Sequence, residues 1–202
     1  ETQGILKALG VGDFDLLGPS MGGSIALVLT SRNPHAVRKL VLVDSAPRIP
    51  PAEGGSVPRN GFANRPLSFA TRADAEAYTR TILPAEARNR PLDYGFVERN
   101  GTWTWRTDIA GMLRSQVSRD PLWQTGLWPE LASIGCPTII LRSGKPQNIS
   151  PAAVARIALT NPLVRVTDYH DAGHWLHQAE PERFMRETLT FLAPATGGGS
   201  GR

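Results

Sequence analysis

A serine hydroxyl on a sharp turn between a strand and a helix is the group in this sequence best suited to nucleophilic chemistry. Ser20 is the centre of the G-x-S-x-G pattern at residues 18–22. In this pattern the serine occupies a strained strand-to-helix turn, and the glycines leave room for the backbone to reverse. The turn would present the hydroxyl at a helix N-terminus, where unpaired amides and the helix dipole stabilise developing negative charge. The alternative is an ordinary glycine-rich turn with a capping serine.

The residues on either side of the pattern favour the nucleophile over the cap. Residues 14–17 fit a short buried strand, and the apolar residues 25–29 are typical of a helix packed beneath a sheet. Asn33 and Pro34 end that helix. Strand, serine turn and helix therefore follow one another in the order that the pattern requires, and we predict that Ser20 is a nucleophile.

A serine hydroxyl needs a base to take its proton, and His174 is the best placed histidine. It lies in a glycine-containing loop, residues 171–175, directly after a predicted strand at residues 164–167. The other three histidines lack this combination and are interpreted as surface or packing residues: His35, His170 and His177. Because the carboxyl ends of parallel strands share one sheet edge, Ser20 and His174 should meet although they are far apart in sequence.

Alternating strands and helices must position these residues, and they predict an α/β fold with a mostly parallel sheet and flanking helices. Apolar runs predict further strands at residues 39–44 and 137–142. Helices are expected over residues 150–159 and 181–192, the last one with Phe184, Met185 and Phe191 on its buried side. Core segments are accordingly expected at residues 1–47 and 136–192, and a disordered tail at residues 193–202.

Residues 48–135 interrupt this alternation and are interpreted as an inserted, mainly helical lid. A helix is expected over residues 72–83 behind the capping Thr71, and Asn100 with Gly101 predicts a tight hairpin turn. The tryptophans of this segment either form a small core of the lid or line an apolar substrate pocket. The candidates for substrate contact are Trp103 and Trp105, together with Trp175 beside the histidine.

Composition limits the function classes. The 22 basic and 18 acidic residues are scattered without long runs, so the net charge of +4 gives no reason to expect nucleic acid as a partner. The single cysteine, Cys136, cannot form an internal disulfide and fits a small buried residue at a strand start, which allows a cytoplasmic location. No segment has the pattern of a membrane span or a signal peptide, and no membrane partner is expected.

Together these segments resemble the α/β-hydrolase superfamily, in its serine-nucleophile, cap-containing branch. The resemblance covers residues 1–192 and rests on four stretches: residues 18–23, 40–47, 136–142, and Gly173-His174-Trp175 with residues 181–184. It implies a Ser20 nucleophile, a His174 base, the Met21 amide as half of an oxyanion hole, and a cap over the site. It implies no metal and no organic cofactor. Because the nucleophile is serine rather than aspartate, the epoxide and haloalkane branches are disfavoured.

The acid that orients the histidine departs from the family pattern. The family usually carries this acid in the loop after the strand at residues 137–142, where residues 144–148 read G-K-P-Q-N without a carboxylate. Asp44, at the end of the neighbouring strand, is the acid we name, a position that some family members use. Gln147 or Asn148 could instead accept the imidazole N–H, although an amide supplies no charge and can favour the wrong tautomer. Asp168 and Asp171 fit the role less well.

The resemblance also implies about four strands, and the second oxyanion amide, ahead of the first strand of this chain. We therefore expect that the chain begins within a domain and needs that N-terminal segment of its own fold. Alone, it should be poorly stable and weakly active.

The function that these residues predict is hydrolysis of a small uncharged ester, or a related acyl substrate, through an acyl-enzyme. A non-catalytic binding protein for a small ligand, with the same fold, is the alternative of a different class. A cofactor-free perhydrolase would use the same residues.

Overall fold

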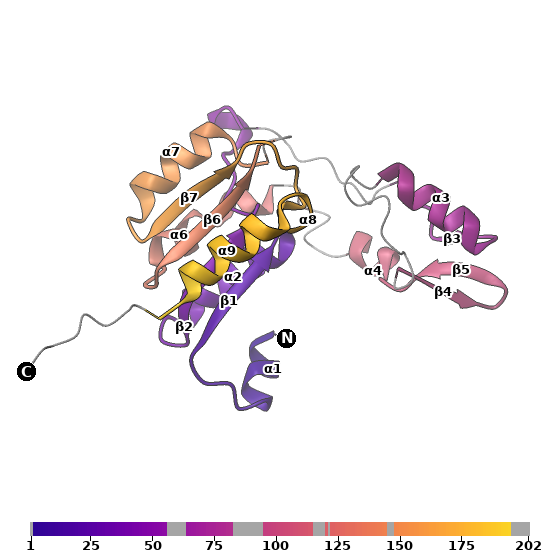
Figure 1. Ribbon diagram of the computed structural model, residues 1–202, viewed down its shortest axis with the longest axis horizontal. Coiled ribbons are helices and arrows are strands. Elements are labelled where there is room, and N and C mark those ends of the chain that lie inside the picture. The colour runs from indigo at the N-terminus through magenta and orange to yellow at the C-terminus, as the bar shows by residue number, and fades with distance from the viewer. Residues whose placement is uncertain are drawn as a thin grey trace, which may run out of the picture. The chain divides into compact units, whose positions relative to one another are not determined.

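The computed structural model describes residues 2–55, 64–82, 95–114, 120, 122–144 and 148–194. The chain divides into two compact units: Glu1–Ile49 with Thr125–Arg202, which we call the core unit, and Pro50–Gln124, which we call the insert unit. Figure 1 shows the elements of both. None of the helices in the described ranges is long and apolar enough to cross a membrane.

The core unit is built on a parallel sheet of four strands, each of which the sequence predicts, and the structure adds their order, β1-β2-β6-β7. The strands are β1 (Phe14–Pro19), β2 (Val37–Val43), β6 (Thr138–Ser143) and β7 (Val164–Tyr169). Every neighbouring pair is parallel. The carboxyl ends of all four strands therefore lie at one edge of the sheet, which is where α/β folds place their sites.

Helices cover both faces of this sheet. The helices of the core unit are α1 (Thr2–Ala8), α2 (Met21–Arg32), α6 (Trp128–Ser133), α7 (Pro151–Thr160), α8 (Leu176–Ala179) and α9 (Pro181–Leu192). On one face, Val41, Ile139 and Leu141 pack with Leu176 and Phe184 of α8 and α9. The alternate residues Leu40, Leu42 and Ile140 point to the opposite face and are fully buried too, so both faces of the two central strands are covered.

The last helix buries a narrower stripe than expected. Phe184 and Thr188 are buried, and Phe191 packs at the margin of the core, but Met185 is 52% exposed. The expectation for Met185 is therefore wrong. The step of one residue turns its side chain about 100° around the helix axis from Phe184, and thus away from the sheet.

The insert unit contains an antiparallel sheet as well as helices. Its elements are η1 (Pro51–Glu53), β3 (Ser68–Phe69), α3 (Arg72–Ile82), β4 (Phe96–Arg99), β5 (Thr102–Trp105) and α4 (Ile109–Arg114). A short helix, η3 (Trp123–Gly126), begins in this unit and ends in the core unit. The strand order is β3-β5-β4. Asn100 and Gly101 both have positive φ, which confirms the hairpin turn. The Thr71 hydroxyl accepts from the Asp74 amide at 3.1 Å, which confirms the cap.

The insert unit is shorter than residues 48–135. Residues 125–135 belong to the core unit, because Leu131 is fully buried there and the indole Nε1 of Trp128 donates to the Arg48 carbonyl at 3.0 Å. A lid function for the insert unit stays a prediction. The predicted tail falls mostly on residues 195–202, outside the described residues.

Candidate active site

The turn at Ser20 connects β1 directly to α2. Ser20 has φ 51° and ψ −121°, a backbone conformation that non-glycine residues rarely adopt and that is concentrated at functional sites. Its amide donates to the Val43 carbonyl at 2.9 Å, which ties the turn to the end of β2. This turn therefore places the serine beside the residue that follows β2, which is Asp44.

The glycines that this turn requires are Gly18 and Gly23. A Cβ on Gly18 would lie 2.5 Å from the Gly22 carbonyl oxygen, and one on Gly23 would lie 2.5 Å from Cβ of Ser45. A Cβ on Gly22 would meet only Cδ of Pro19, at 3.4 Å, an ordinary contact. The steric need thus falls on the first glycine of the G-x-S-x-G pattern and on the glycine just after it.

Asp44 follows β2 and has a buried carboxylate that four donors surround. Oδ1 accepts from the Ser143 amide at 3.0 Å and from the Ser143 hydroxyl at 2.8 Å. Oδ2 lies 2.6 Å from Nδ1 of His174 and accepts from Nδ2 of Asn148 at 2.5 Å. Asp44 also has a positive φ of 48°, the only described non-glycine residue to share this feature with Ser20 outside the hairpin turn.

These contacts fix the charge of the carboxylate and the tautomer of the imidazole. Burial alone would raise the pKa of the Asp44 carboxyl, but hydrogen bonds from the imidazole, from Ser143 and from Asn148 outweigh burial and lower it. An ionised oxygen at 2.6 Å from Nδ1 requires a proton on that nitrogen. Nε2 of a neutral His174 is then an unprotonated acceptor, which is the form that a general base needs.

The loops that carry the imidazole and its partners approach each other closely. The Gly144 amide donates to the Ala172 carbonyl at 3.0 Å, and a Cβ on Gly144 would lie 2.0 Å from the His170 carbonyl oxygen. The side chain of His174 is 35% exposed. The ring of Trp175 meets the imidazole edge to face at 5.9 Å between centroids and is itself 40% exposed.

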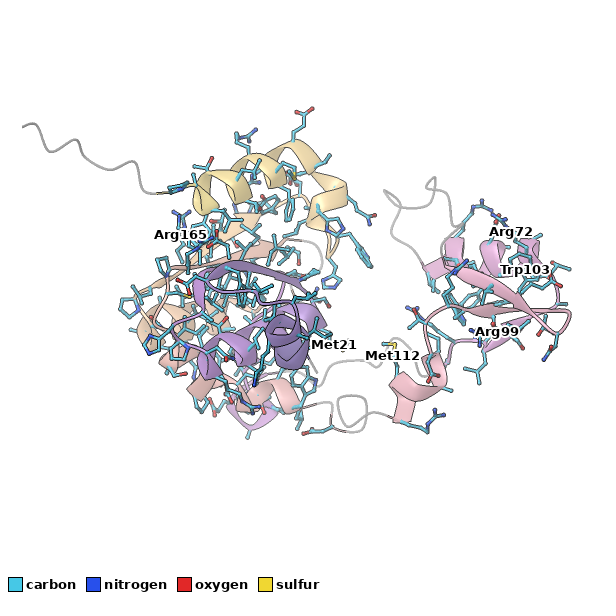
Figure 2. The ribbon with its side chains drawn as sticks, turned by 90° about the horizontal axis from the view of Figure 1, so that it is seen from below. Met21, Arg72, Arg99, Trp103, Met112 and Arg165 are labelled. Atoms are coloured by element: carbon cyan, nitrogen blue, oxygen red, sulfur yellow. The ribbon has the colours of Figure 1, made fainter. Side chains whose placement is uncertain are left out.

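Met21 is the first residue of α2, and Figure 2 marks its side chain on the core unit. The first amides of a helix have no carbonyl partner within the helix. The Met21 amide therefore stands at the position where such a donor can serve an oxyanion next to Ser20.

Trp103 and Trp105 lie in the insert unit. The Trp105 ring packs 4.5 Å from that of Phe96, and its Nε1 donates to the Pro66 carbonyl at 2.8 Å. Trp103 lies beneath the guanidinium of Arg72, 5.7 Å from the ring centroid, and both are labelled in Figure 2. Trp105 thus contributes to the small aromatic core of this unit, and substrate contact by either ring stays a prediction.

The remaining candidates for orienting the imidazole lie elsewhere or act differently. Asp168 pairs with Arg142 at 2.9 Å. Asp171 lines a cavity of about 310 Å³ with His170, Ala172, Ala179, Glu180 and Arg183. Gln147 lies outside the described residues. Asn148 donates to Asp44 rather than accepting from the imidazole.

Sequence reasoning missed Ser143. The only local sign of its role is that it is a serine at the end of a buried strand. This does not show which residue it bonds to. The strand order places β6 next to β2, and only this pairing brings the Ser143 amide and hydroxyl to Asp44, 99 residues away in sequence.

A parallel sheet with a strained serine turn after one strand, and an Asp–His pair at the ends of its neighbours, defines the α/β-hydrolase class of proteins. The family model described as "Alpha/beta hydrolase family" matches residues 2–187. The chain belongs to this family.

Curated relatives match nearly the whole chain. It is 24% identical over 202 residues to sn-1-specific diacylglycerol lipase ABHD11 of Mus musculus, with 96% of this chain and 63% of the relative covered. It is 29% identical to 2-hydroxymuconate semialdehyde hydrolase of Pseudomonas putida, with 95% and 66% covered. The chain thus spans slightly less than two thirds of these relatives' lengths.

Solved structures share the fold. E-2-(acetamidomethylene)succinate hydrolase superposes with a TM-score of 0.77 at 23% identity, covering 94% of this chain and 70% of that one. A marine microorganism esterase superposes with a TM-score of 0.69 at 21% identity, covering 95% and 74%.

Proposed function

We propose that this chain carries the catalytic residues of a serine hydrolase that cleaves small uncharged esters or related acyl compounds through an acyl-enzyme. The observation that carries the proposal is the 2.6 Å contact between Oδ2 of the buried Asp44 and Nδ1 of His174. It supplies the carboxylate that the loop after β6 lacks in its sequence, and it leaves Nε2 as a base. The family membership and the hydrolase names of the relatives support the same class.

In the proposed first step, Nε2 of His174 takes the proton of the Ser20 hydroxyl while the oxygen attacks the substrate carbonyl. The imidazolium that forms is stabilised by the ionised Asp44. The tetrahedral oxyanion is stabilised by the Met21 amide and the positive end of α2. The imidazolium then gives its proton to the leaving alcohol, and the ester bond breaks.

In the proposed second step, His174 deprotonates water, whose oxygen attacks the carbonyl of the acyl-enzyme. The imidazolium then returns this proton to the Ser20 oxygen as the acyl–oxygen bond breaks, which releases the acid and restores the serine. Trp175, exposed next to the imidazole, is proposed to border the bound substrate.

Covalent labelling with a fluorophosphonate tests the proposal directly. The purified chain should react slowly, Ser20→Ala should not react, and Ser31→Ala should react at the parent's rate. Ser31 is the matched control because it lies on the same helix, with its hydroxyl donating to the Val28 carbonyl at 2.9 Å. An ester panel of increasing acyl length then defines the substrate range.

Two results would contradict the proposal. Equal labelling of Ser20→Ala would place the nucleophile elsewhere. A folded chain that takes no label, yet melts at a higher temperature with small ligands present, would identify a binding protein.

A further inference from the structure

We propose that Asn148 is a positioning residue, whose side-chain amide holds Oδ2 of Asp44 against Nδ1 of His174. This inference rests on the proposed function, because the pair that Asn148 positions is the acid and base of that reaction. The loop after β6 lacks a carboxylate, but through Asn148 it still helps to position the acid and the base.

The orientation of the amide follows from the charges around it. Nδ2 of Asn148 lies 2.5 Å from Oδ2 of Asp44 and 3.0 Å from Nδ1 of His174. The opposite orientation would place the amide oxygen against an ionised carboxylate, with repulsion in place of a hydrogen bond. Nδ2 therefore faces the carboxylate.

The contact between Nδ2 of Asn148 and Nδ1 of His174 is not itself the bond that matters. Nδ1 carries a proton for Asp44, so neither nitrogen can accept from the other. Two donors instead converge on one oxygen, Oδ2, while Ser143 occupies Oδ1. Rotation of the carboxylate would break bonds on both sides, and its plane is fixed relative to the imidazole.

The loop is held at both of its ends, so Asn148 is not placed by its own contacts alone. At the start, the Gly144 amide donates to Ala172 in the histidine loop at 3.0 Å. At the end, Nε of Arg142 donates to the Ile149 carbonyl, directly after Asn148, at 2.7 Å. The Arg142 side chain is buried and is itself held by Asp168 at 2.9 Å.

Asn148→Asp tests the position of Asn148, because its effect on kcat should have opposite signs in the parent and in the Asp44→Asn variant. Asn148→Asp in the parent puts a second carboxylate against Asp44, and two like charges at this distance disfavour ionisation of both. In the Asp44→Asn background, the same substitution supplies a carboxylate within reach of Nδ1. We expect Asn148→Asp to lower kcat in the parent and to raise it in Asp44→Asn.

The magnitudes separate positioning from packing. Asp44→Asn should lose about 10⁴ in kcat, the size of the change that the same substitution causes in the serine-protease triad. Adding Asn148→Asp should recover at least about tenfold, and Asn148→Ala alone should cost about tenfold in kcat with KM unchanged, as expected for one hydrogen bond. A purely structural role for Asn148 would give losses in both backgrounds.

Asn33→Ala is the matched control for loss of an asparagine amide, because Nδ2 of Asn33 donates to the Leu29 carbonyl at 2.7 Å at the far end of α2. It should lower the melting temperature without changing kcat. Circular dichroism establishes that each variant is folded.

A proton NMR readout makes the result independent of turnover. The hydrogen-bonded Nδ1 proton of His174 should give a strongly downfield signal that is lost in Asp44→Asn and returns in the double variant. If the signal behaves so but Ser20 takes no fluorophosphonate, the hydrolase is wrong and the positioning holds. If Asn148→Asp restores neither signal nor rate in folded Asp44→Asn, the role of Asn148 is wrong.

Discussion

The buried carboxylate of Asp44 accepts hydrogen bonds from four donors, which come from three different segments of the chain. Its side chain is fully buried, and every donor comes from outside its own loop: Ser143 ends β6, Asn148 follows β6, and His174 follows β7. A buried charge is tolerated only when it is paired and hydrogen-bonded. The same contacts that make Asp44 a candidate catalytic acid therefore also link its ionisation to folding.

The pH dependence of stability follows from the lowered pKa of Asp44. Because the pKa is lower in the folded than in the unfolded chain, ionisation of Asp44 stabilises the fold. This contribution is fully present above the unfolded value of about 4 and is lost as the pH falls through the folded value. Asp44→Asn should therefore lower the free energy of unfolding near neutral pH, and its difference from the parent should shrink in acid.

Urea unfolding at neutral pH and below about pH 4 measures this difference. Asp15→Asn is the control, because its carboxylate lies in an exposed pair with Arg38 at 3.2 Å and should contribute little. A gap between Asp44→Asn and the parent that stays constant with pH would contradict the linkage.

The turn between β1 and α2 is the element that the sequence defines best. The five-residue pattern and the strand and helix on either side of it lie close together in sequence, and together they predict the turn. The close contacts of its glycines, at 2.5 Å for both Gly18 and Gly23, explain why the backbone can approach its neighbours. They also show which glycines have no room for a side chain, and the sequence pattern alone does not show this.

Alanine substitutions along this turn should differ according to those contacts. Gly18→Ala and Gly23→Ala force backbone atoms or Ser45 to move and should each cost about 1–3 kcal/mol or more in the free energy of unfolding, as overpacking does. Gly22→Ala is the matched control, with an ordinary 3.4 Å contact to Pro19 and a position inside α2. It should be neutral or stabilising, since alanine favours a helix more than glycine does. Thermal melts of the three variants measure the order, and a Gly22→Ala variant as unstable as the other two would contradict it.

Elements and site residues differ in how far the sequence predicts them. The strands of the parallel sheet and the ends of α3 and α7 follow from apolar runs and capping residues, which are local. Ser20 and His174 carry local signals too, a glycine pattern and a glycine loop. The partner of the imidazole has none, because Asp44 and His174 are 130 residues apart and meet only through the strand order. For this reason the sequence left Asp44 and two amides as alternatives.

The two compact units each have an apolar core of their own. In the core unit it lies on both faces of the parallel sheet, around residues such as Ile140 and Leu131, both fully buried. In the insert unit it is the aromatic cluster of Phe69, Phe96 and Trp105. Units with separate cores can unfold in separate transitions, so a probe is needed that reports on one of them.

Cys136 is such a probe for the core unit. It is the single cysteine of the sequence, lies just before β6 and is 5% exposed. Burial raises the pKa of its thiol, so both access and thiolate formation oppose reaction in the folded chain. We expect alkylation by iodoacetamide to be slow without urea and to become faster in the urea range where the parallel sheet unfolds.

Leu131→Ala removes a buried side chain and should lower the free energy of unfolding by about 2–5 kcal/mol. It should therefore shift alkylation to lower urea concentrations. Phe96→Ala, in the insert unit, should shift it much less, and Cys136→Ser should take no label. Alkylation that is fast in the native chain, or that responds equally to both alanine variants, would show that Cys136 is accessible without unfolding or that the two cores melt as one.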